Sequence, residues 1–141
     1  MNHATLAVRL SELLSQMHGR AIVHDAFREL EGDGGPLLRI DSEGYHLVWI
    51  ERGQECSRQS TGDAENMVFR ILADSAFGAG VAYELANRVD GPDFRRMVHA
   101  RQRESFARLG PEWRARLAAE IAGVLAEHPY RDAPPSQLPG A

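Results

Sequence analysis

Histidine and cysteine are the residues of this 141-residue chain best suited to metal binding or nucleophilic chemistry. The histidines are scattered, and none forms an H-E-x-x-H motif or a close ligand pair with a cysteine or a carboxylate. They are His3, His18, His24, His46, His99 and His128. Cys56 has no nucleophile signature around it and is typical of a small buried apolar residue. The sequence therefore predicts no metal site, no cofactor and no catalytic residue.

Two further enzyme patterns were weighed. Gly78-Ala79-Gly80 lies within a helical pattern, follows no strand and lacks a third glycine, so it is not a dinucleotide-binding fingerprint. The small residues there instead predict the close approach of another element. A small enzyme with a site assembled from Glu51, Arg52 and either His46 or His99 is an alternative that no spacing supports.

Residues suited to protein recognition gather in the first half of the chain. An acidic run of Glu29, Glu31 and Asp33 adjoins a Gly- and Pro-rich loop, and two more carboxylates flank the next turn. Tyr, Trp and Arg dominate interface hot spots, and Tyr45, Trp49 and Arg52 follow these carboxylates in the sequence. The complete set of candidate partner-binding residues is Glu29, Glu31, Asp33, Asp41, Glu43, Tyr45, Trp49 and Arg52. Ordinary solubility charge is the alternative interpretation of the carboxylates, and packing under a helix is the preferred interpretation of Trp49.

The segment 93–109 is rich in arginine and predicts an amphipathic helix with a cationic face. Its arginines are Arg95, Arg96, Arg101, Arg103 and Arg108. A nucleic-acid-binding regulator that uses this helix is the second functional hypothesis. The net charge of −4 and the absence of interleaved aromatic residues argue against it, because nucleic-acid binding needs clustered cations.

The composition is that of a globular protein, with 43% apolar and 26% charged residues. The length suits a single domain over residues 1–132, followed by a Pro-rich tail, 133–141, that we expect to be disordered. Arg9 and Glu12 interrupt the apolar residues of the first 19 positions, a pattern not expected of a signal peptide, and no stretch reaches the ~18 apolar residues of a membrane span. With one cysteine and therefore no internal disulfide, a cytoplasmic location and no membrane partner are expected.

The hydrophobic period changes twice along the chain. A 3/4 spacing of leucines predicts a helix over 4–18, and residues 21–30 could continue as a short second helix. Strands are expected at 37–41, 45–52 and 54–60, joined by turns short enough to make them antiparallel neighbours. Helices are expected from Thr61 or Asp63 to about residue 88, then over 93–109 and 111–128. The predicted class is α+β: an N-terminal helix, a three-stranded antiparallel sheet, then three packed helices.

One run of residues makes the chain recognisable. Tyr45-His46-Leu47-Val48-Trp49-Ile50-Glu51-Arg52-Gly53 resembles a motif of immunity protein 63, a family of bacterial polymorphic toxin systems. The resemblance spans roughly residues 36–132. Its further pieces follow in order as Thr61-Gly62-Asp63, Tyr83-Glu84, Asn87-Arg88, Asp93-Phe94-Arg95-Arg96, Gln102, Trp113, Pro129-Tyr130 and Asp132.

The resemblance implies a non-enzymatic antidote. Such a protein binds the C-terminal toxin domain of its cognate partner and blocks the active site or substrate access. No catalytic residue is implied, and the motif residues are expected to be scaffold. These residues are Glu51, Gly53, Tyr83, Glu84, Arg95, Arg96, Trp113, Pro129, Tyr130 and Asp132.

Overall fold

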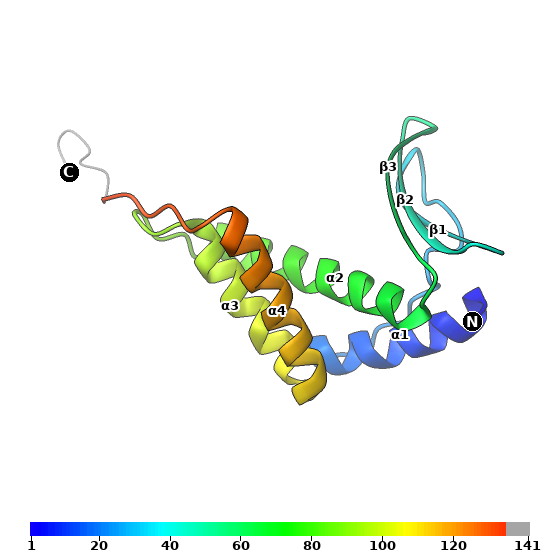
Figure 1. The fold of residues 1–141 in the computed structure, drawn as a ribbon, viewed down its shortest axis with the longest axis horizontal. Coiled ribbons are helices and arrows are strands. Elements are labelled where there is room, and N and C mark those ends of the chain that lie inside the picture. The colour runs from blue at the N-terminus through cyan, green and yellow to red at the C-terminus, as the bar shows by residue number, and fades with distance from the viewer. Residues whose placement is uncertain (135–141) are drawn as a thin grey trace. The chain divides into compact units, whose positions relative to one another are not determined.

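The structure is a computed structural model that describes residues 1–134, and it confirms the predicted α+β architecture (Figure 1). The elements, in order, are α1 (His3–His18), β1 (Gly34–Asp41), β2 (Gly44–Glu51), β3 (Gln54–Thr61), α2 (Ala64–Ala86), α3 (Phe94–Ala107) and α4 (Pro111–Glu127). The chain forms two compact units, Met1–Leu72 and Ala73 onward, and α2 begins in the first and ends in the second. Within residues 1–134, no helix is both long and apolar enough to cross a membrane.

The first unit holds α1 against the sheet and the start of α2. The apolar stripe of α1 is buried along its whole length. Its residues are Leu6, Leu10, Leu13, Leu14 and Met17. Asn2 caps the helix through the Thr5 amide, and Gly19 ends it with a φ of 68°. A bidentate ion pair from Arg9 to Glu65 ties α1 to α2.

The prediction of a short helix over residues 21–30 is wrong. This segment runs without helix back along α1, where the hydroxyls of Ser11 and Ser15 bond the backbone of His24 and Ile22. Ala26 and Phe27 then adopt φ values of 62° and 51°, which a right-handed helix does not allow. The serine hydroxyls already satisfy backbone amides and carbonyls of this segment, so helix formation would add no hydrogen bonds to those groups.

The sheet has the order β1-β2-β3, with both pairings antiparallel. The central strand buries side chains on both of its faces, with Tyr45 on one and Val48 and Ile50 on the other. The turns that join the strands are short, as predicted, and each has two residues, Ser42-Glu43 and Arg52-Gly53. A bulge between Trp49 and Ile50 leaves Cys56 as an extra residue in β3.

The second unit consists of the latter part of α2 with α3 and α4. Ala79, Ala82 and Leu85 of α2 are exposed, and Leu85 retains 62% of its surface. The buried positions are Ala73, Ala76, Gly80 and Glu84, and the last three are spaced by four residues. At Gly80 the close approach of α3 leaves no room for a larger side chain, because an added Cβ would lie 2.9 Å from the Val98 carbonyl oxygen.

The two neighbouring glycines of α2 should respond oppositely to alanine. A Cβ at Gly80 would lie 2.9 Å from the Val98 carbonyl oxygen, whereas at Gly78 it would meet nothing within 4 Å. We expect Gly80→Ala to lower the free energy of unfolding by about 1–3 kcal/mol through overpacking. Gly78→Ala should raise it by about 0.5–1 kcal/mol through helix propensity. Urea unfolding of both variants measures this, and equal signs would contradict the packing argument.

The chain remains held beyond the end of α4. The Ala133 amide donates to the Gly91 carbonyl at 2.7 Å, and the Asp93 amide donates to the Asp132 carboxylate at 2.8 Å. The tail predicted to be disordered begins at residue 133, and its residues 135–141 lie outside those that the structure describes.

Candidate functional site

The candidate site lies at the end of the sheet away from α1, where β2 turns into β3 and β1 begins (Figure 1). We call this region the distal end. Two shallow hollows of about 470 and 590 Å³ adjoin there and share Gly34. Glu29 and Glu31 line the smaller hollow, and Asp33, Glu51 and Arg52 line the larger. Four of the carboxylates and arginines predicted to bind a partner are thus brought together, with Glu51 beside them.

Trp49 is an exposed residue on the last part of β2. Packing under a helix was the preferred expectation, but the side chain retains 46% of its surface. Its neighbours in the sheet are Pro36 on β1 and Ser57 on β3, which lie directly opposite it on either side. An exposed tryptophan on a rigid strand offers a large contact area with little rotamer entropy to lose.

Arg52 occupies a strained backbone position. It forms the β2–β3 turn with Gly53, and the φ values are 51° and 77°. Two positive φ angles define the type I′ turn, which favours Asn or Asp followed by Gly. An arginine in this conformation costs of order 1 kcal/mol, and such strain tends to collect at functional positions.

The carboxylates of the distal end differ in their pairing. Glu55 accepts a bidentate bond from Arg58, at 2.7 and 3.1 Å, and also lies 3.5 Å from Arg39. This pairing with Arg58 lowers the pKa of Glu55. Within residues 1–134, Asp33 and Glu51 form no ion pair, so their charges remain available to a partner.

The Glu55–Arg58 pair was not predicted. Residues three apart in a regular strand point to opposite faces of the sheet. The bulge at Cys56 reverses this, because Glu55 pairs with Ile50 and Arg58 with Val48, which share a face. No sequence signal reveals the bulge.

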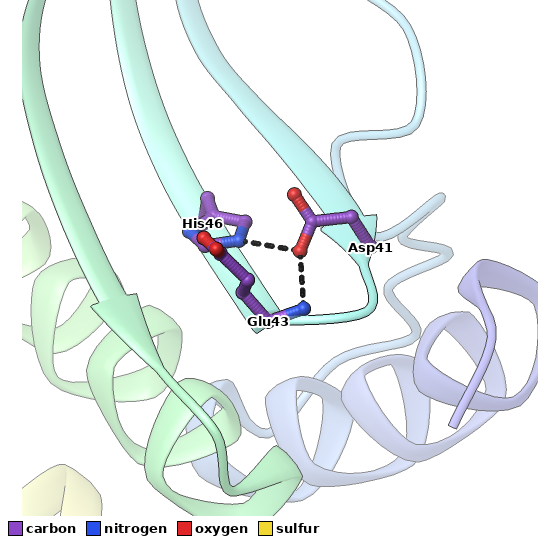
Figure 2. A group of neighbouring side chains, drawn as sticks. All are labelled: Asp41, Glu43 and His46. Atoms are coloured by element: carbon purple, nitrogen blue, oxygen red, sulfur yellow. Dashed lines mark hydrogen bonds and ion pairs between the residues drawn. The ribbon is translucent and has the colours of Figure 1, made fainter.

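The opposite end of the sheet holds the other two predicted carboxylates. β1 has eight residues, so Asp41 and Glu43 lie roughly 25 Å along the sheet from the distal end. The acidic residues therefore form two separate groups. Figure 2 shows Asp41, Glu43 and His46 gathered at the β1–β2 turn.

This second group is a hydrogen-bonded lock of the turn. Asp41 Oδ1 lies 2.9 Å from His46 Nε2 and accepts the Glu43 amide at 2.8 Å (Figure 2). The His46 ring is buried, and its Nδ1 is 2.7 Å from the Ser60 hydroxyl. The ligand atoms of the three residues lie within 4.8 Å of one another, a spacing that can hold a metal ion. Because both ring nitrogens are already engaged, a metal would have to displace the Asp41–His46 bond.

Asp41 should contribute stability that depends on pH. The hydrogen bond from His46, followed by the Glu43 amide, holds the pKa of Asp41 below its ordinary value. This contribution is present above the unfolded pKa of about 3.9 and is lost as the pH falls through the lower folded pKa. Asp41→Asn keeps an acceptor but does not titrate. Urea unfolding should therefore show a stability difference at pH 7 that shrinks toward pH 3; a constant difference would contradict the assignment.

Tyr45 was predicted to contact a partner, but the structure makes it a packing residue. Only 8% of its surface is exposed, and its hydroxyl accepts a bond from the N-terminal amine of Met1 at 2.5 Å. The position beside α1 explains this burial, which strand alternation alone does not reveal.

An ion-pair and hydrogen-bond network closes the second unit. Asp93 accepts the amides of Arg95 and Arg131, and its carboxylate pairs with the Arg95 side chain at 3.0 Å. Arg95 also donates to the carbonyls of His128 and Pro129. Arg96 pairs with Asp132 at 2.7 Å and lies 4.3 Å above the Tyr130 ring. The network fastens the chain after α4 to the start of α3.

A comparison with family models finds a match to immunity protein 63 over residues 41–123. The match covers more than half of the chain, from the β1–β2 turn through most of α4. The chain belongs to the immunity protein 63 family. A search of curated proteins finds no match, and a search of solved structures finds none either.

The family motif residues of this immunity protein divide by location. In the second unit, Glu84 is 3% exposed and pairs with Arg88, Trp113 is half-buried near the start of α4, and Arg96 is exposed. Tyr83 is 39% exposed, and the Arg101 guanidinium lies 4.1 Å above its ring. Glu51 and Gly53 instead lie at the distal end. Pro129, Tyr130 and Asp132 follow the matched range, and they belong to the hydrogen-bond and ion-pair network around Asp93 and Arg96.

The arginine helix of this immunity protein is largely engaged with its own carboxylates. Arg95, Arg96 and Arg101 pair with Asp93, Asp132 and Glu104. A phosphate-binding face would need these cations directed outward, so the structure does not favour the nucleic-acid alternative. His99 is likewise internal, with its Nδ1 bonded to the Tyr130 hydroxyl at 2.7 Å. Burial and the cations of Arg103 and Arg95 lower the pKa of His99.

Proposed function

We propose that this immunity protein protects its cell by binding a cognate toxin domain in the cytoplasm, through the distal end of the sheet. The observation that carries the proposal is the exposed Trp49 near the strained Arg52 and the unpaired carboxylates of Asp33 and Glu51. Aromatic and arginine anchors inside a charged rim are the usual arrangement of an interface hot spot.

Charge supports a basic partner surface. The residues lining the two hollows include the carboxylates of Asp25, Glu29, Glu31, Asp33, Glu51 and Glu55, with Arg52 as their arginine. A toxin that acts on nucleic acid has a cationic groove, and an acidic surface that covers the groove excludes its substrate. Long-range attraction also accelerates encounter at low ionic strength.

The mechanism is occlusion rather than chemistry. Few free toxin molecules are tolerated in a cell, so we expect a Kd near or below 1 nM, or about −12 kcal/mol. An interface of this strength buries at least ~1,200 Å² in total. The two hollows and Trp49 would lie at its centre. The substrate is blocked without any covalent step on the immunity protein.

Co-expression with the toxin domain encoded by a neighbouring gene tests the proposal. We expect the full chain to restore growth and the purified proteins to form a stoichiometric complex. The association rate should fall steeply as salt rises from about 50 to 500 mM, because screening shortens the reach of the acidic surface. A chain that neither binds the toxin nor restores growth contradicts the function. A salt-independent association rate contradicts the electrostatic part.

A further inference from the structure

The two edges of the sheet differ in how they are covered. On β1, the Leu38 amide donates to the Phe27 carbonyl at 2.9 Å, and the Leu38 carbonyl lies 2.7 Å from His3 Nε2. On β3, within residues 1–134, no backbone hydrogen bond leads anywhere except to β2. Seven of its eight residues are exposed. An open edge of this length is a template for pairing with another strand.

The register shows which β3 groups point outward. Because the amide and carbonyl of Leu38 face the outer edge of β1, the Leu38–Leu47 pair shares no hydrogen bonds. Leu47 therefore directs its own groups toward β3, where its partner is Gln59. Alternation then leaves the amides and carbonyls of Arg58 and Ser60 facing away from the sheet.

The usual protection of an edge strand is weak here. β3 contains neither lysine nor proline, and its arginine, Arg58, is folded onto Glu55. The bulge at Cys56 disturbs only the start of β3, so the outward groups of Arg58 and Ser60 lie on its regular part. This part of the edge offers two amides and two carbonyls.

We propose that β3 accepts an extended strand of the toxin, so that the toxin continues the sheet as a fourth strand. This inference rests on the proposed function. The start of β3 lines the acidic hollow through Gln54, Glu55 and Cys56. A strand laid along β3 thus runs into the distal end, where basic side chains at its end would meet Asp33 and Glu51. A second copy of this chain fits less well, because its own β3 brings only an arginine already paired with Glu55.

The substitution Arg58→Pro distinguishes toxin binding through the edge of β3 from toxin binding through other surfaces. Arg58→Pro removes an outward amide that the β2–β3 ladder does not use, so the sheet should persist. Arg58→Ala is the matched control, since it also removes the side chain but keeps the amide. We expect the proline variant to bind the toxin domain at least about tenfold more weakly than the alanine variant. Circular dichroism checks that both variants remain folded.

Amide hydrogen exchange of the wild-type chain supplies a measurement without substitution. The amides of Arg58 and Ser60 should exchange rapidly in the free protein and become protected in the complex, whereas the Gln59 amide should be protected in both. Equal binding by the two variants, or outward amides left unprotected in a complex that still forms, overturns the inference while the proposed function stands. Protection that rises with protein concentration without toxin identifies a second copy as the occupant and also overturns it. A wild-type chain that does not bind the toxin removes both proposals.

Discussion

Asp93→Ala is expected to lower the free energy of unfolding by about 3 kcal/mol. The Asp93 side chain is 8% exposed, caps α3 through the Arg95 amide and accepts the Arg131 amide. Truncation leaves the Arg95 guanidinium, itself 20% exposed, without its carboxylate partner. A partly buried cation that loses its partner keeps its desolvation cost, which makes this substitution more severe than the loss of a cap alone.

Urea unfolding near pH 7 measures the effect, with Glu104→Ala as the matched control. The Arg101–Glu104 pair lies on the same helix, but its side chains are 43% and 65% exposed. Exposed pairs contribute little, so Glu104→Ala should cost less than about 1 kcal/mol. Similar losses in the two variants would show that the network around Asp93 is not a stabilising unit.

The stability loss caused by Asp93→Ala should become smaller in acid. Hydrogen bonds from the Arg95 side chain and the Arg131 amide hold the pKa of Asp93 far below its ordinary value, and Arg96 lowers the pKa of Asp132 to about 2. Lowered folded pKa values mean that this stabilisation is fully present above about pH 4 and decreases as the pH falls from there toward the folded pKa values. The gap between wild type and Asp93→Ala should therefore narrow over that interval.

Trp49→Ala is expected to weaken toxin binding about 100-fold, or about 2.7 kcal/mol. The indole is 46% exposed in the free protein, so its burial would occur largely on complex formation. Because little of its surface is used in folding, the variant should lose less than about 1 kcal/mol of stability. Surface plasmon resonance against the toxin domain measures the Kd, and thermal unfolding measures the stability.

Phe77→Ala is the control for this variant. Phe77 is also an aromatic residue, 41% exposed, but it lies on α2 rather than on the sheet. Its replacement should change the Kd by less than about threefold. Should Phe77→Ala weaken binding while Trp49→Ala does not, the interface would lie on the helices and the distal end would lose its assigned role.

The sequence by itself determined what depends on neighbouring residues. The leucine spacing of α1, Asp63 before α2, Asp93 before α3 and Pro111 at the first position of α4 specify helix positions through local hydrogen bonds and periodicity. The Glu51-Arg52-Gly53 turn joins two adjacent strands for the same reason. The ordered motifs across residues 45–132 were also sufficient to indicate the family that the match over 41–123 confirms.

Only the tertiary structure decided which side chains are covered. Trp49 and Tyr45 share a strand face, yet Trp49 is exposed at the distal end while Tyr45 is buried beside α1. The acidic candidates follow one another closely in sequence, but β1 holds them at opposite ends of the sheet. The bulge at Cys56 and the close approach of α3 to Gly80 likewise depend on partners distant in sequence. Burial is a property of contacts between elements, and local periodicity carries no information about which contacts those are.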